Sequence, residues 1–144
     1  LDGANIEIRE EAGEENFFLF GMSAAEVNVM RSHYDPAAII AADNDLHRVM
    51  QLLKCGHFSQ FEHGIFDPIL HAINNPDDMW MTAADFRSFV DAQAEAGNAY
   101  QDEARWTRMS IMNTACSGRF STDRTMRDYN DDIWHVEPVS LESS

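Results

Sequence analysis

The apolar positions of this chain predict two short strands near its beginning, followed by a series of amphipathic helices. Residues 4–8 alternate apolar and polar side chains, as a half-buried strand does. Residues 17–20 are continuously apolar and end at Gly21, which is typical of a strand covered on both faces. Between them, residues 9–16 are acidic and leave room for about one helical turn. We therefore expect a strand, a turn and a second strand.

From Ser23 onward the spacing becomes helical, and capping residues mark where helices begin. Ser23 and Glu26 form a capping-box pattern, so a short helix should follow Ser23. Asp35 precedes a proline at the first helical position, which predicts the start of another helix. Apolar residues at spacings of three and four predict two more amphipathic helices, at 46–53 and 66–73.

The second half of the chain is also predicted to be mainly helical. Residues 79–83 are expected to form a short strand or an extended link, and Asp85 should cap a helix that runs to Tyr100. Another helix is predicted from about Trp106 to 118, and Ser121 should open the last one. This last helix places four apolar side chains on one face, which we expect to be its inner face: Met126, Tyr129, Ile133 and Trp134.

The two predicted strands determine how we interpret the organisation of the chain. A pair of strands is marginal alone and needs neighbours that this sequence does not supply. We therefore expect residues 1–138 to be the carboxyl-terminal part of a larger α/β domain whose other strands precede Leu1, with 139–144 as a tail. The alternative is a stand-alone acidic helical module that binds a protein partner without catalysis.

The charge balance narrows the possible partners. The chain has 25 acidic and 10 basic residues and a formal net charge of -15; nine of the basic residues are Arg, and Lys54 is the one lysine. Nucleic acids and anionic membranes are poor partners, because both are bound through clustered basic residues. No apolar run reaches the length of a membrane span, so we expect a cytoplasmic protein. Cys55 and Cys116 are expected to be free thiols.

Candidate metal and nucleophile residues do not form a recognised pattern. The closest metal set lies in one segment: Cys55, His57, Glu62, His63 and His71. Its spacing matches no zinc motif, so these are better explained as loop and helix-end residues, with zinc binding a weaker alternative. The acidic residues Asp43, Asp45, Asp77 and Asp78 lack the EF-hand spacing and are expected to cap helices.

Phosphate-binding and catalytic motifs are equally weak. Glycine turns at 2–5 and 13–16 lack a dinucleotide or P-loop pattern, and the carboxylates beside them would repel an anion. Ser121 has no evident His and Asp partners and is assigned a capping role. From the residues alone, the sequence predicts no catalytic, cofactor-binding or metal-binding residue.

Several long motifs nevertheless resemble the glycogen and starch phosphorylases, the α-glucan phosphorylases. The resemblance begins with Leu-Asp-Gly-Ala-Asn-Ile-Glu-Ile-Arg-Glu-Glu at 1–11 and Gly-Glu-Glu-Asn-Phe-Phe-Leu-Phe-Gly at 13–21. It returns, in the same order and at similar spacing, at 84–86, 106–109, 118–125 and 133–134. The stretch from Ala41 to Met81 matches only loosely.

The resemblance implies a fold and a reaction. The fold is of the GT-B glycosyltransferase type, two Rossmann-like domains facing across a cleft, with this mostly helical segment contributing the last strands and helices of the carboxyl-terminal domain. The reaction is cleavage of terminal α-1,4-glucosidic bonds by phosphate to give glucose 1-phosphate, assisted by the phosphate of pyridoxal 5'-phosphate. The resemblance also implies a homodimer that degrades glycogen in the cytoplasm.

The resemblance places the catalytic groups outside this sequence. In the family, the lysine that binds the cofactor lies shortly before the position of Leu1, and Lys54 does not match its motif. We therefore expect the catalytic, cofactor and metal sites to be absent here, and this segment to be structural and inactive alone. Its main partner would be the upstream part of the same phosphorylase.

Overall fold

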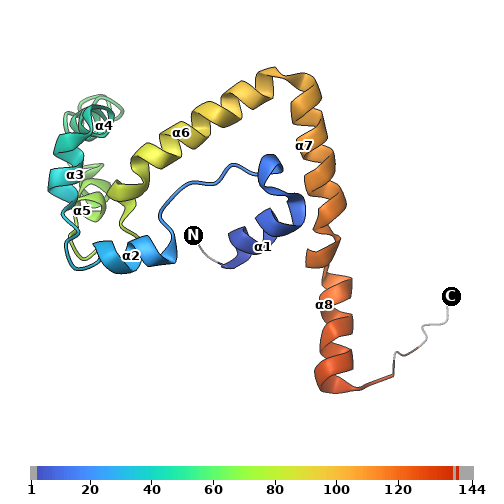
Figure 1. Cartoon of the computed structure of the whole chain (residues 1–144). Helices are drawn as coiled ribbons and strands as arrows, with labels where there is room; N and C mark the ends of the chain where they lie inside the picture. The colour runs from blue at the N-terminus through green and yellow to red at the C-terminus, as the bar shows by residue number, and fades with distance from the viewer. Residues whose placement is uncertain (1–2, 138, 140–144) are drawn as a thin grey trace. The chain divides into compact units, whose positions relative to one another are not determined.

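The computed structural model describes residues 3–137 and 139, and every regular element in those residues is helical (Figure 1). The chain divides into two compact units. The described part of the first is residues 18–101, and that of the second is residues 3–17 with 102–137 and 139. The mostly helical character predicted for this segment is confirmed.

The first unit contains five helices among its described residues: α2 (Ala24–Met30), α3 (Pro36–Ala42), α4 (Asn44–Lys54), α5 (Asp67–Ile73) and α6 (Thr82–Gln101). The starts of α2, α3 and α4 follow from capping chemistry. Ser23 Oγ accepts from the Glu26 N–H, while the Glu26 carboxylate accepts from the Ser23 N–H at 2.7 Å, so the predicted capping box is confirmed. Asp35 caps α3 through the Ala38 N–H at 3.0 Å, as predicted.

The core of the first unit lies where α3, α4 and the start of α6 meet. Its buried residues are Tyr34, Ile40, Leu46, Met50, Met81 and Ala83. The Tyr34 hydroxyl accepts a hydrogen bond from the Ala83 N–H at 3.3 Å, which joins the end of the α2–α3 connection to α6. Met81 is only 2% exposed, although its backbone has a left-handed φ of 51°. The start of α6 is therefore held by packing against a strained residue.

The second unit consists of α1 (Gly3–Ala12), η1 (Glu14–Asn16), α7 (Glu103–Cys116), η2 (Ser117–Phe120), α8 (Thr122–Tyr129) and the π-helical turn η3 (Asn130–Trp134). Asn16 joins the two chain segments that make up this unit. The Asn16 amide donates to the Ala12 carbonyl, and the Asn113 amide of α7 donates to the Asn16 carbonyl, both at 2.8 Å. Because Asn16 is only 4% exposed, its polar groups need partners within the protein, and these hydrogen bonds provide them.

The predicted strands are wrong. Residues 4–8 lie inside helix α1, because the five-residue alternation is followed by helix-favouring Arg, Glu and Ala residues, and Ile8 and Ala12 turn to the same side. Phe17 has an extended backbone, with φ of -138° and ψ of 137°, but residues 17–20 form no strand in the described chain. Instead Phe20 packs edge-on against Phe89 of α6, with ring centroids 5.2 Å apart.

Three predictions about α6 and the last helix are also wrong. Residues 79–83 form neither a strand nor an extended link, because 79–80 lie in a turn and α6 begins at Thr82. Asp85 therefore lies within the first turn of α6 and instead accepts from the Met22 N–H at 3.0 Å. The N–H groups of Trp80 and Thr82 are bound by Asp78. On the last helix, the four apolar side chains at 126, 129, 133 and 134 are exposed in the described structure.

No helix within residues 3–137 is both long and apolar enough to cross a membrane. The predicted tail at 139–144 falls outside the described residues apart from Val139, which is exposed.

Candidate functional site

Two rows of polar side chains face each other from α4 and α5 in the first unit. On α4 the row consists of His47, Gln51 and Lys54; on α5 it consists of Asp67, His71 and Asn74. Both rows follow the same spacing of four and then three residues, which places their members on one helical face. Each of the six side chains is exposed.

The rows line a pocket of about 360 Å³. Three apolar residues complete its wall: Ile40 of α3, Met50 of α4 and Leu70 of α5. Ile40 and Met50 belong to the buried core, and Leu70 packs against that core. The volume is within the usual range of ligand pockets, which is about 300–1,000 Å³.

Hydrogen bonds within the rows use only part of their capacity. The Gln51 amide and His47 Nε2 lie 3.2 Å apart along α4, and the Asn74 amide donates to the Leu70 carbonyl at 2.8 Å. Each amide side chain has two N–H donors and an acceptor oxygen. Gln51 and Asn74 therefore retain donor and acceptor capacity for a ligand.

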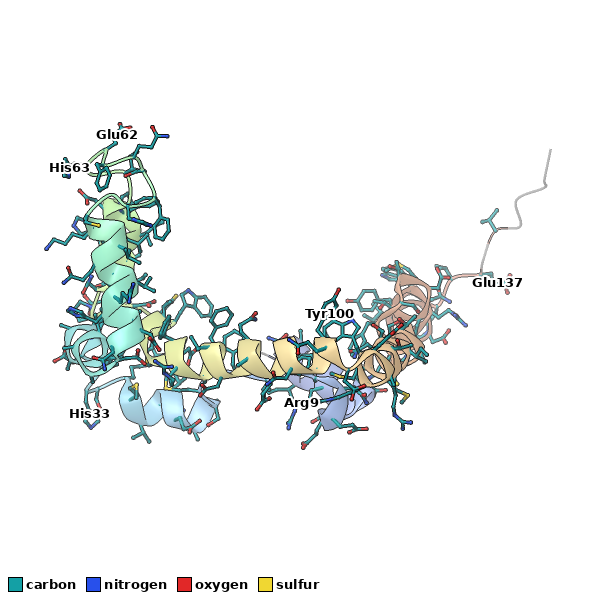
Figure 2. All side chains as sticks on the ribbon, turned by 90° about the horizontal axis from the view of Figure 1, so that it is seen from above. Arg9, His33, Glu62, His63, Tyr100 and Glu137 are labelled. Atoms are coloured by element: carbon teal, nitrogen blue, oxygen red, sulfur yellow. The ribbon has the colours of Figure 1, made fainter. Side chains whose placement is uncertain are left out.

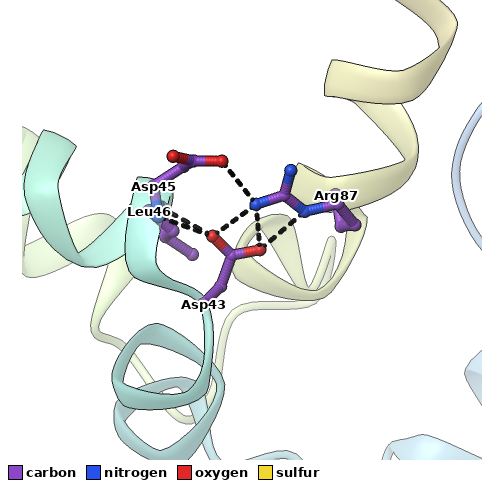
Figure 3. A network of polar contacts seen from close by, with 4 residues as sticks. All are labelled: Asp43, Asp45, Leu46 and Arg87. Atoms are coloured by element: carbon purple, nitrogen blue, oxygen red, sulfur yellow. Dashed lines mark hydrogen bonds and ion pairs between the residues drawn. The ribbon is translucent and has the colours of Figure 1, made fainter.

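A network at the start of α4 fixes this helix against α6 (Figure 3). Asp43 caps α4 by accepting from the N–H groups of Asp45 and Leu46, both at 3.0 Å. Arg87 of α6 donates through Nε and Nη2 to the two oxygens of Asp43, at 2.8 and 2.7 Å, and through Nη2 to Asp45 at 2.8 Å. The Leu46 N–H and then the Arg87 guanidinium lower the pKa of Asp43, and Asp45 and Asp43 raise the pKa of Arg87.

The loop that joins the two rows, residues 55–66, presents aromatic rings to solvent. Phe58 is 61% exposed and Phe61 is 69% exposed. Figure 2 shows Glu62 and His63 at the outer end of this loop. The polar rows lead into the loop along both helices, because Lys54 is the last residue of α4 and Asp67 is the first of α5.

The structure separates the histidines that the sequence placed together. His57 and His63 lie on the loop, whereas His71 lies on α5 and faces the pocket with His47. Within residues 3–137 and 139, no group of three or more His, Cys, Asp or Glu side chains is placed to hold a metal ion. Cys55 and Cys116 are both free, as predicted.

The remaining candidates have structural roles. Ser121 caps α8 by accepting from the Arg124 N–H at 3.3 Å, as predicted. The backbone N–H of Asp77 donates to the Asn75 side chain at 3.0 Å, and Asp78 accepts from the N–H of Thr82, the first residue of α6, at 2.9 Å. At the turn after α1, Gly13 has a φ of +89° and the carboxylate of Glu15 lies where an added Cβ would point. That carboxylate would repel a phosphate.

Sequence reasoning missed His47, Gln51 and Asn74 as members of one site. The signal was present as two polar rows with identical spacing, at 47, 51, 54 and at 67, 71, 74. Such rows are also typical of solvated helix faces, so the pattern alone does not identify a pocket. Only the packing of α5 beside α4 brings the rows together.

Comparisons with known proteins relate nearly the whole chain to one enzyme family. The family profile described as carbohydrate phosphorylase matches residues 1–136. The chain is similar to glycogen phosphorylase of Synechocystis (43% identical over 99% of this chain and 17% of the relative) and to the cytosolic alpha-glucan phosphorylase 2 of Arabidopsis thaliana (41%, over 95% and 16%). It is also similar to the chloroplastic/amyloplastic alpha-1,4 glucan phosphorylase L isozyme of Vicia faba (39%, over 99% and 14%). The chain thus spans about one sixth of the length of these relatives.

Proposed function

The chain belongs to the carbohydrate phosphorylase family, and from this we propose that the complete protein is an α-1,4-glucan phosphorylase. It would transfer the terminal glucosyl unit of an α-glucan, such as glycogen, to inorganic phosphate and release glucose 1-phosphate. The observation that carries this proposal is the family match over residues 1–136, supported by three relatives at 39–43% identity.

Within this proposal, residues 1–138 belong to the carboxyl-terminal Rossmann-like domain of a GT-B fold and contribute structure to it. The described helices supply packing surfaces, and the pocket between α4 and α5 has no nucleophile poised beside a general base. Catalysis would then depend on residues other than those described here. We infer that the 144-residue chain alone does not catalyse phosphorolysis.

The complete enzyme would use pyridoxal 5'-phosphate, whose phosphate supplies acid and base chemistry in this reaction. We infer that the pocket beside Lys54 does not hold that group. Lys54, the one lysine of the sequence, ends helix α4 and lines its pocket with Asp67, and no arginine lines the same pocket. A cofactor phosphate is usually held by several cations, whereas Lys54 is the one basic residue of this pocket that is charged when histidine is neutral, and Asp67 offsets that charge.

The exposed apolar face formed by the end of α8 and by η3 supports a structural role toward the remainder of the enzyme. Tyr129, Ile133 and Trp134 are 45, 64 and 52% exposed. Grouped apolar side chains of this size are typical of an interaction surface. We propose that the remainder of the phosphorylase covers this face, and that the complete enzyme is a cytoplasmic homodimer.

An assay of glucose 1-phosphate release tests the proposal. The complete protein and the 144-residue chain would each be incubated with glycogen and phosphate, with and without pyridoxal 5'-phosphate. We expect release by the complete protein with the cofactor and none by the 144-residue chain. An inactive complete protein would overturn the assigned reaction, and an active 144-residue chain would overturn its structural role.

A further inference from the structure

The pocket between α4 and α5 combines donors and acceptors without a net charge of its own. Gln51 and Asn74 offer both kinds of group, and each histidine can donate or accept according to its tautomer. Lys54 and Asp67 carry opposite charges and lie at the same end of the two rows. This lining suits a neutral molecule that has many groups able both to donate and to accept hydrogen bonds.

Charged ligands fit the pocket less well. An anion would meet Asp67 and the field of a chain whose formal net charge is -15. A metal ion would require three or more ligating side chains in reach, which the described residues do not provide. The apolar wall formed by Ile40, Met50 and Leu70 also favours a ligand that has an apolar face.

We propose that this pocket binds a segment of an α-1,4-glucan chain, an inference that rests on the proposed function. Glucosyl hydroxyls each donate and accept, which matches the two polar rows, and the C–H faces of the sugar rings match the apolar wall. The ligand is uncharged, so neither Asp67 nor the net charge opposes binding.

The loop at 55–66 extends this surface with aromatic rings. Its backbone is held in a fixed form: the Gly56 carbonyl accepts from the N–H groups of Ser59 and Phe61 at 3.0 and 2.9 Å, and Ser59 Oγ donates to the Glu62 carbonyl at 2.7 Å. Gln60 and Phe61 both have left-handed backbones, with φ of 51° and 64°. The hydrogen-bonded backbone of the loop therefore reduces the conformational entropy that it would lose on binding a ligand through Phe58 and Phe61.

The local charge of the loop also agrees with a neutral ligand. Between Cys55 and Phe66, Glu62 is the one residue that is charged when histidine is neutral, whereas the whole chain is strongly acidic. Exposed rings offer flat apolar surfaces to the C–H face of a sugar. A glucan segment that occupies the pocket would continue across this loop.

Hydrogen–deuterium exchange of the complete protein tests the proposal with a local readout. The probe is maltoheptaose, and exchange is followed in peptides that cover residues 44–74. We expect slower exchange there at saturating maltoheptaose. In the Gln51→Ala/Asn74→Ala variant, we expect the concentration for half-maximal protection to rise about tenfold, as the loss of a few neutral hydrogen bonds would cause. Arg48→Ala, an exposed change on α4 outside the pocket, should leave that concentration unchanged.

Three results would overturn the proposal. One is unchanged exchange at 44–74 while other peptides become protected by maltoheptaose. Another is equal protection in the double variant and in the Arg48→Ala control. The third is protection of 44–74 by inorganic phosphate alone, which would make the pocket an anion site. Loss of the proposed phosphorolysis is a separate result, because it appears in the release of glucose 1-phosphate and not in exchange at these residues.

Discussion

Arg87 of α6 and Asp43, the residue that caps α4, form a two-point pair in which Nε and Nη2 of the guanidinium reach the two carboxylate oxygens at 2.8 and 2.7 Å. The same carboxylate binds the N–H groups that open α4. One side chain therefore sets both where α4 begins and how it is held against α6. Because α4 carries half of the polar lining of the pocket, this pair positions the candidate site.

Substitutions at Asp43 should separate the cap from the ion pair. Asp43→Asn keeps an oxygen that can cap the helix but removes the charge, whereas Asp43→Ala removes both. We expect Asp43→Ala to lower the Tm more than Asp43→Asn, and Arg87→Ala to add little in the Asp43→Ala background. Thermal unfolding of the single and double variants measures this, with Asp91→Ala as an exposed carboxylate control on α6. Equal losses for Asn and Ala would contradict the capping role.

The same pair predicts a loss of stability in acid. The pKa of Asp43 is lowered from its ordinary value of 3.8, so the folded state favours the ionised carboxylate. The resulting stabilisation is complete above pH 3.8 and is lost as the pH falls through the lower folded-state pKa. Urea unfolding between neutral pH and strong acid should show a shallower decline for Asp43→Asn than for the unmodified chain. Parallel curves would mean that the pKa of Asp43 is the same in the folded and the unfolded state.

Met81 should contribute more to stability than Met79, which lies two residues earlier. It is 2% exposed, whereas Met79 is 63% exposed. Met81→Ala keeps a residue with a Cβ at the left-handed φ, so the change reports mainly the lost side chain. We expect a cost of about 2–5 kcal/mol in the free energy of unfolding. Met79→Ala should change it by no more than about 0.5 kcal/mol.

A small effect of Met81→Ala would contradict the packing of this core. Chemical unfolding of the two methionine variants side by side gives the comparison, because both substitutions remove the same atoms. A large loss of unfolding free energy in Met79→Ala would mean that the Met79 side chain is buried in solution and not exposed.

The sequence was most informative where a side chain forms a hydrogen bond with the backbone of a residue a few positions away. The Ser23–Glu26 box, the Asp35 cap and the Ser121 cap depend on residues within a few positions of one another, and all three are confirmed. The strand predicted at 4–8 was wrong, because five alternating residues also fit a helix when helix-favouring residues follow them. Whether such a short pattern forms a strand or a helix depends on what the segment packs against in the folded chain.

The candidate site shows the same limit at longer range. The rows at 47, 51, 54 and at 67, 71, 74 are each visible in the sequence, but their facing arrangement depends on how the connecting loop returns α5 beside α4. The pair of Arg87 with Asp43 joins residues 44 positions apart and has no local pattern. Contacts of this kind depend on tertiary packing, and the periodicity of a single sequence does not predict them.

The apolar face formed by the end of α8 and by η3 should behave differently in the 144-residue chain and in the complete protein proposed above. Ile133 is 64% exposed, so Ile133→Asp should change the stability of the 144-residue chain by no more than about 0.5 kcal/mol. If the remainder of the phosphorylase covers this face, the same substitution buries a charge there and should cost the complete protein about 2 kcal/mol or more. Thermal and chemical unfolding of both forms provide the comparison, with Asp131→Asn as an exposed control in the same turn. If Ile133→Asp destabilises both forms equally little, the remainder of the protein does not cover this face. If it destabilises both forms equally strongly, the fold of the 144-residue chain itself already covers the face.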